Sequence, residues 1–159
     1  MGDKVNGLKK AFRKVGYTAK AASGIASKSS ENGVSGGVAV AAPNSRSVTM
    51  RDSTHVCTDH APKLHGEEWI IAVIHRRGLS LAYVVAYFVC GGYGDVNRRR
   101  VAALRTTLIA LGLPYIIAAD WNATPDELRD SGMLGDLVGR IRTPANATHT
   151  CTAGQERML

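Results

Sequence analysis

The spacing of hydrophobic residues predicts two amphipathic helices. Between Val5 and Val15, apolar residues recur three and four positions apart, with lysines and arginines between them, and Gly16 follows. This is typical of a helix that packs one face and ends at a glycine. A second helix is predicted to begin at Asn97 and to stop at Gly112. Its expected buried stripe consists of Val101, Leu104, Leu108 and Leu111.

Strands are predicted where apolar and β-branched residues run together between turn residues. These segments are Gly36–Ala42, Ser47–Met50 as an edge strand, Glu67–His75, Leu79–Val89 and Tyr115–Ala119. The third and fourth flank Arg76-Arg77-Gly78, which indicates a hairpin, and their continuous apolar runs indicate burial on both faces. Residues 22–35, rich in Ser, Gly and Asn, predict a loop. The order strand, helix, strand predicts a βαβ crossover and an α/β fold.

A third helix is predicted to begin at Pro125. Thr124 is a favoured N-cap, proline is favoured in the first turn, and Glu127 completes a capping box. Asp120 therefore comes at the carboxyl end of a strand, where ligands bind in open α/β sheets. A carboxylate at this position is compatible with a metal or phosphate site. It is equally compatible with an acid that only accepts backbone N–H bonds in a turn.

Composition and charge indicate one ordinary soluble domain with an anionic partner. The chain has 159 residues, of which 45% are hydrophobic and 21% are charged, and its formal charge is +7. A basic chain favours nucleic acid, DNA or RNA, although a basic helix face is more often simply solvated. The three cysteines are widely spaced, which favours a reducing compartment. With no secretory signal and no apolar run long enough for a membrane span, we expect an intracellular protein, nuclear or cytoplasmic.

The segment Ala119-Asp120-Trp121-Asn122 resembles a family signature, the Gly-Asp-Phe-Asn that ends a strand in the endonuclease/exonuclease/phosphatase superfamily. The acid and the amide match, whereas the aromatic residue and the glycine are changed. The surroundings follow the family order as well: a helix ending in "GY", a strand "SGGVAV", a strand "VVAYFV" and an arginine-rich helix. The resemblance implies part of a four-layer α/β/β/α sandwich and Mg²⁺-dependent hydrolysis of phosphodiesters or phosphomonoesters.

The resemblance also implies roles for three residues. Asp120 would orient or activate the attacking water, and Asn122 would contact the scissile phosphate. Tyr87 would correspond to the active-site tyrosine of the family. The alternative for Tyr87 is an aromatic residue packed in the core, and for Asn122 a turn or cap residue.

Other parts of the family pattern have no counterpart in residues 1–159. The metal-binding glutamate of a Gln-Glu pair and the Ser-Asp-His motif are not matched, and Glu31, Glu67 and Glu68 lie outside the metal-ligand context. No metal ligand is therefore assigned. The resemblance implies a single, incomplete domain that is inactive in isolation, and "THTCTAGQERML" is similar to the approach to the next family strand.

Two further groups of residues were considered as sites. The loop "CGGYGDVNRRR" precedes a helix, so Arg98, Arg99 and Arg100 could bind a substrate phosphate or could form a solvated first turn. Cysteines and histidines in "CTDHAPKLH" and at residues 149 and 151 fit no standard zinc finger, so zinc is not expected.

The sequence thus predicts a fragment of a Mg²⁺-dependent phosphodiester hydrolase, nuclease-like or derived from a retroelement endonuclease. The alternatives are a non-catalytic nucleic-acid-binding remnant and a relative of small-molecule or inositol phosphatases.

Overall fold

A computed structural model describes residues 2–22, 25–26, 34–35, 37–52, 69–89 and 92–142. Its elements are, in chain order, α1 (Gly2–Lys14), β1 (Tyr17–Ala22), β2 (Ile25–Ala26), β3 (Val34–Ser35), β4 (Val38–Pro43), β5 (Val48–Asp52), β6 (Trp69–Arg76), β7 (Leu79–Tyr87), α2 (Asp95–Leu111), β8 (Tyr115–Asp120), α3 (Pro125–Asp130) and α4 (Met133–Asp136). The chain divides into two compact units, Met1–Tyr87 with Thr107–Asp120, and Phe88–Thr106 with Trp121–Leu159. We call them unit 1 and unit 2.

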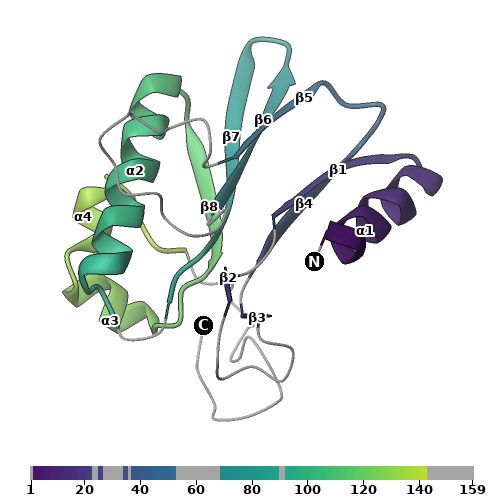
Figure 1. The fold of residues 1–159 in the computed structure, drawn as a ribbon. Helices are drawn as coiled ribbons and strands as arrows, with labels where there is room; N and C mark the ends of the chain where they lie inside the picture. The colour runs from purple at the N-terminus through teal and green to yellow at the C-terminus, as the bar shows by residue number, and fades with distance from the viewer. Residues whose placement is uncertain are drawn as a thin grey trace. The chain divides into compact units, whose positions relative to one another are not determined.

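Unit 1 contains a mixed four-stranded sheet of order β5-β6-β7-β8 (Figure 1). The β5–β6 and β6–β7 pairs are antiparallel, and the β7–β8 pair is parallel. A parallel pair needs a crossover, and the chain passes through α2 between β7 and β8. The predicted βαβ connection and the α/β class are confirmed, as is the edge strand predicted around residues 47–50.

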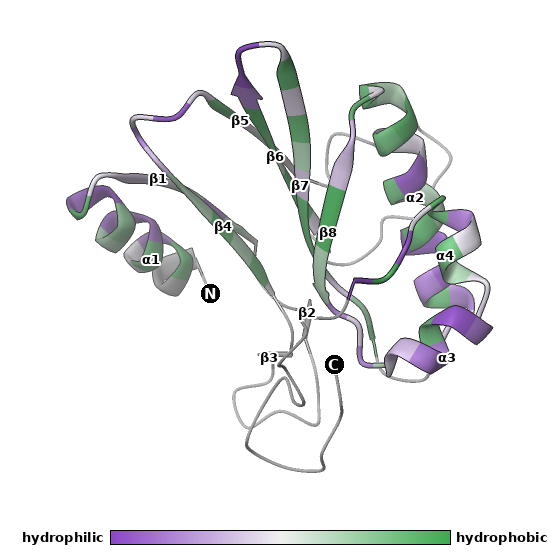
Figure 2. Ribbon diagram, turned by 180° about the vertical axis from the view of Figure 1, so that it is seen from behind, coloured by the Kyte–Doolittle hydropathy of each residue, from purple (hydrophilic) through white to green (hydrophobic). Residues whose placement is uncertain are grey.

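The β6–β7 hairpin forms as predicted. Its turn contains Gly78 with φ of 73°, a left-handed conformation that glycine adopts without steric cost. Figure 2 shows β6 and β7 as mainly hydrophobic, and the first five residues of β6 are all buried, as predicted. The predicted burial of both faces was wrong for β7, in which buried residues alternate with half-buried ones. The prediction that the last strand is buried was wrong: β8 is mostly half-buried, and Ile116 is 51% exposed. This strand is at the edge of the described sheet, so it has a neighbour on one side there.

A second sheet of unit 1 consists of β1 and β4, which are antiparallel with Tyr17 opposite Pro43. Strand β4 packs against β6 and β7, and α1 packs against β1. The contact between the sheets is apolar. It is centred on the buried Val38 and Ile70, with Val40, Val85 and Tyr87 packed around them.

Strands β1, β2 and β3 were not predicted. Strand β1 reads "YTAKAA", and alanine and lysine have low strand propensity, so β1 depends on its pairing with β4 and its packing against α1. Strands β2 and β3 fall inside the segment that was predicted to be a loop, and they pair with each other over two residues each. Backbone pairing thus forms strands where the local sequence signals are weak.

The helix boundaries follow their local signals closely, but two predicted packed faces were wrong in part. Leu8 of α1 is 41% exposed and Val15, which follows α1, is 68% exposed, and Leu111 of α2 is half-buried.

Helix α2 begins at Asp95, two residues before the predicted start, and Val101, Leu104 and Leu108 are buried. It ends where expected, because Gly112 adopts φ of 61° and its N–H donates to the Leu108 carbonyl at 3.1 Å. In the part of the chain that the structure describes, no helix combines the length and hydropathy needed to cross a membrane.

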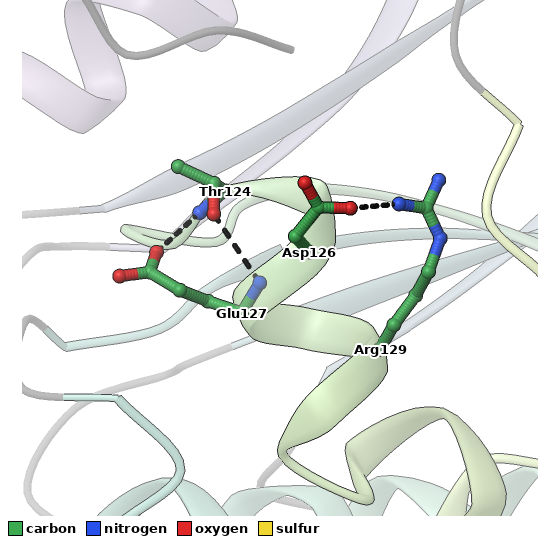
Figure 3. Close-up of polar contacts among 4 residues, drawn as sticks. All are labelled: Thr124, Asp126, Glu127 and Arg129. Atoms are coloured by element: carbon green, nitrogen blue, oxygen red, sulfur yellow. Dashed lines mark hydrogen bonds and ion pairs between the residues drawn. The ribbon is translucent and has the colours of Figure 1, made fainter.

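In unit 2, α3 begins with the predicted capping box (Figure 3). The Thr124 hydroxyl accepts from the Glu127 N–H at 3.2 Å, and the Glu127 carboxylate accepts from the Thr124 N–H at 2.6 Å. Two N–H groups at the start of the helix are satisfied in this way. Leu128, and Met133 and Leu137 in the segment around α4, are buried.

Candidate active site

The parallel pairing in unit 1 brings two of the predicted catalytic residues to the same end of the sheet. Tyr87 is the last residue of β7, Asp120 is the last residue of β8, and they are register partners. Side chains of strand residues alternate between the two faces, so Tyr87 and Asp120 leave the sheet on one face. Asp120 is exposed at this carboxyl end, whereas Tyr87 is half-buried.

Tyr87 lies on the face that packs against β4. Its ring contacts the cluster formed by Val38 and Ile70, so the side chain contributes to the interface between the two sheets of unit 1. This packing agrees with the structural alternative for Tyr87. It also fixes the ring beside the Asp120 position, and the catalytic role of Tyr87 stays a prediction.

In unit 2, the two residues after Asp120 both contact Phe88, the residue that follows β7. The Trp121 ring stacks on Phe88, with centroids 4.9 Å apart and an interplanar angle of 4°. Asn122 has φ of 48°, a region that asparagine tolerates better than most residues, and its Nδ2 donates to the Phe88 carbonyl at 2.8 Å. Asn122 is therefore a turn residue with a structural hydrogen bond. Contact with a phosphate is a further role that stays a prediction.

A buried asparagine organises the arginine-rich loop of unit 2. Asn97 is 2% exposed; its Oδ1 accepts from the Val89 N–H at 3.1 Å, and its Nδ2 donates to the Val89 and Gly92 carbonyls at 2.9 and 2.7 Å. These bonds join the residues before and after the turn to the first turn of α2. The loop conformation therefore depends on one carboxamide.

The three arginines that follow Asn97 do not share one environment. Arg98 and Arg99 are exposed, whereas Arg100 is only 3% exposed. Consecutive helical residues point about 100° apart, and residues four apart share a face, so Arg100 lies on the side of α2 that carries the buried Leu104. Arg98 and Arg99 are the accessible candidates for phosphate contact, and that role stays a prediction for all three.

A second polar cluster in unit 2 was not predicted from the sequence. The Tyr93 hydroxyl donates to the Asp136 carboxylate at 2.5 Å, and the Arg98 guanidinium lies 5.5 Å from the centroid of the Tyr93 ring. Arg98 Nε also donates to the Tyr93 carbonyl at 3.1 Å. Burial, and then the hydrogen bond and the charge of Asp136, raise the pKa of Tyr93 to about 12. Tyr93 and Asp136 are far apart in sequence, so no local pattern predicts their contact.

The described residues do not form a complete metal site. No group of three or more His, Cys, Asp or Glu side chains gathers within the described ranges to hold an ion. Asp120 alone is a poor match for Mg²⁺, which takes near-octahedral oxygen coordination and is usually bound by one or two carboxylates with waters and substrate phosphates. Residues outside the described ranges include those considered for zinc or metal binding: Cys57, His60, His65, His149, Cys151, Glu31, Glu67 and Glu68.

No family model matches the sequence, and no curated protein matches it significantly. Several solved structures are similar in fold, among them the following two. The human nocturnin catalytic domain, solved with a bound sulfate anion, has a TM-score of 0.50 and 16% identity over 83% of this chain and 53% of that one. The endonuclease domain of TRAS1, a telomere-specific non-LTR retrotransposon, has a TM-score of 0.50 and 13% identity over 96% of this chain and 73% of that one.

In open α/β folds, ligands bind at the edge of the sheet where the parallel strands end. The particular fold is that of the endonuclease/exonuclease/phosphatase superfamily, to which both similar structures belong. The resemblance predicted from the sequence is confirmed at the level of the fold. The chain spans about half the length of the nocturnin catalytic domain.

Proposed function

We propose that this chain is a nuclease-like portion of a phosphodiester hydrolase that acts on DNA or RNA. One observation carries the proposal: exposed Asp120 ends a parallel strand in register with Tyr87, at the sheet edge where α/β folds bind ligands. A net charge of +7 supports a polyanionic substrate. The similar TRAS1 structure is an endonuclease domain, which supports nucleic acid over a lipid or an inositol phosphate.

The proposed role of Asp120 follows from its position and chemistry. Hydrolysis of a phosphodiester needs a correctly placed water and stabilisation of the charge that develops on the phosphate. An exposed carboxylate can accept a hydrogen bond from that water and orient it. In unit 2, Asn122 and the accessible arginines Arg98 and Arg99 are each proposed to contact a phosphate of the substrate, since amide N–H and guanidinium groups are donors for phosphate oxygens.

Mg²⁺ remains part of the proposal as a cofactor that lowers the charge on the phosphate when it is bound. Because Asp120 is the one carboxylate assigned to this edge, we expect weak metal affinity and low turnover from the chain by itself. We also retain the proposal that the chain is a central portion of the family domain. This proposal depends on two motifs of the family, Gln-Glu and Ser-Asp-His, which residues 1–159 do not match.

The experiment combines a cleavage assay with a binding assay. Nicking of supercoiled plasmid by the full chain is measured against Mg²⁺ concentration, and binding of a labelled oligonucleotide is followed by fluorescence anisotropy. For Asp120→Asn we expect the cleavage rate to fall by about 10²- to 10⁴-fold, with little change in binding. Asp130→Asn, a matched change of an exposed acid in α3, should retain wild-type cleavage.

The second candidate function is a nucleic-acid-binding remnant without catalysis. It is favoured by the packing of Tyr87 in the core and by the structural hydrogen bond of Asn122 to Phe88. Binding without Mg²⁺-dependent cleavage would support this candidate and reject the hydrolase. Cleavage that persists in Asp120→Asn would remove Asp120 from the mechanism, and absence of both binding and cleavage would reject both functions.

A further inference from the structure

Unit 1 contains an open cavity of about 380 Å³ that none of the predicted site residues line. Arg13, in the last turn of α1, and Arg46, in the turn between β4 and β5, contribute the charge of its wall. Thr18 and Asn44 contribute polar groups. Its volume is within the range of pockets that bind small molecules.

The cavity is far from the carboxyl end that carries Asp120. Val48, on its wall, pairs with Ile74 of β6, and Ile74 pairs with Leu81 near the start of β7. The segment from Leu81 to Tyr87 rises about 3.3 Å per residue, so about 20 Å of strand separates the two levels. A ligand in the cavity would therefore occupy a site distinct from the proposed catalytic edge.

Backbone hydrogen bonds hold the turn that carries Arg46. The Asn44 N–H donates to the Gly16 carbonyl at 2.9 Å, and the Arg46 N–H donates to the Pro43 carbonyl at 2.9 Å. The Thr18 hydroxyl donates to Asn44 Oδ1 at 2.8 Å. This bond occupies the carboxamide oxygen, so the Asn44 amide group can act as a donor to a ligand. Asn44 and Arg46 therefore lie on a turn that hydrogen bonds connect to Gly16, after α1, and to Thr18 of β1.

The charge of the cavity wall has one sign. Two guanidinium groups and no Asp or Glu are present among the described lining residues. Lys9, Lys10 and Lys14 on α1 add further positive potential nearby. The rest of the wall includes Val48 and Met50, which offer no acceptor that would compete for the arginines.

We propose that this cavity is a second anion site, which binds a phosphate group between Arg13 and Arg46. Guanidinium groups match the geometry of phosphate oxygens and can donate two hydrogen bonds to one group. The Asn44 amide supplies an uncharged donor. The phosphate can belong to a nucleic-acid strand or to a free phosphate compound, and the two sources are separated by experiment.

The test uses the full chain with two probes, inorganic phosphate and a fluorescein-labelled single-stranded oligonucleotide. Phosphate binding is followed through the backbone amide NMR signals of Thr18, Asn44 and Arg46, and oligonucleotide binding through anisotropy over a range of salt concentrations. For the double variant Arg13→Gln with Arg46→Gln, we expect the dissociation constant to rise by about 5- to 20-fold. The salt dependence should also weaken by about one unit of slope for each lost phosphate contact.

Arg105→Gln is the matched control, because Arg105 is exposed on α2 and does not line the cavity. Circular dichroism of each variant establishes that it is folded, and Arg46→Lys, which keeps the charge, should retain part of the binding. Loss of binding for both probes supports a site for phosphate groups in general. Loss for the oligonucleotide alone assigns the site to a nucleic-acid backbone.

Two results would overturn the proposal. The first is that phosphate does not shift the amide signals of Thr18, Asn44 and Arg46, and that neither probe loses affinity in the double variant. The second is that Arg105→Gln weakens binding as much as a change at Arg13 or Arg46, which would mean that only total charge matters. Neither result depends on cleavage, so failure of this site and failure of the proposed hydrolase are distinguishable.

Discussion

Replacement of Asn97 by alanine should be among the most destabilising single changes in unit 2. The side chain is 2% exposed, and its carboxamide makes three hydrogen bonds with Val89 and Gly92. Alanine keeps the helical backbone but removes all three. The Val89 N–H and the two carbonyl groups then lose their partner in a part-buried environment, where unsatisfied polar groups cost free energy.

The size of the effect follows from the number of bonds. A typical intramolecular hydrogen bond contributes about 1 kcal/mol net, so three give a loss of about 3 kcal/mol in the free energy of unfolding, with a range of about 1.5 to 4.5 kcal/mol. Alanine has a higher helix propensity than asparagine and returns about 0.5 kcal/mol. For an m-value of about 2 kcal/mol/M, the midpoint of urea unfolding should fall by about 1 M or slightly more.

Equilibrium urea unfolding, followed by both circular dichroism and tryptophan fluorescence, measures this change. Asn6→Ala is the matched control, because Asn6 is an exposed residue of α1. The control should change stability by no more than about 0.5 kcal/mol. If Asn97→Ala unfolds at the same midpoint as Asn6→Ala, the three hydrogen bonds do not stabilise the loop.

A second variant tests the direction of the hydrogen bonds. In Asn97→Asp the carboxylate can still accept from the Val89 N–H, but it cannot donate, and it places negative charge against two carbonyl oxygens. An acid in the first turn of a helix gains only about 0.3 to 1 kcal/mol from the helix dipole. We therefore expect Asn97→Asp to be at least as unstable as Asn97→Ala at neutral pH, and wild-type stability in this variant would contradict the reasoning.

Two other predictions concern unit 2. Thr124→Ala removes the acceptor for the Glu127 N–H and should lower the free energy of unfolding by about 1 kcal/mol, whereas Thr124→Ser should retain the cap. Asp136→Asn should lower the pKa of Tyr93 from about 12 towards 10, although burial, the largest cause of the shift, remains. The tyrosine absorbance of Asp136→Asn is followed against pH. Subtracting the absorbance of the double variant, Asp136→Asn with Tyr93→Phe, leaves the titration of Tyr93. Because the folded-state pKa is raised, the stabilisation is present below pH 10 and is lost as the pH rises towards 12, and this alkaline loss should be smaller in Asp136→Asn.

Local sequence signals predicted much of the secondary structure. The capping box beginning at Thr124, the glycine after α2 and the hairpin glycine Gly78 each specify a backbone conformation through their own chemistry, and each was found at the predicted residue. The uninterrupted apolar run of β6 indicated burial on both faces, because successive strand residues point to opposite faces and here both sets are apolar. From these elements the βαβ crossover follows, and with it the position of Asp120 at a strand end.

The sequence was less informative where partners are distant along the chain. Strand β1 has a sequence with weak strand propensity and depends on its pairing with β4. Within the arginine run, the packed side of α2 decides that Arg100 is buried while Arg98 is exposed. The aromatic stack of Trp121 on Phe88 likewise joins two segments that the sequence separates.

The sequence by itself therefore determined the cap of α3, the end of α2, the β6–β7 hairpin and the residue types at the end of β8, but not strands β1, β2 and β3. Only the tertiary structure decided that Tyr87 is the register partner of Asp120 and that Arg13 and Arg46 line one cavity. The physical reason is the range of the interactions. Turn chemistry, capping and periodicity act between near neighbours, whereas strand register and the gathering of like charges depend on how whole elements pair and pack.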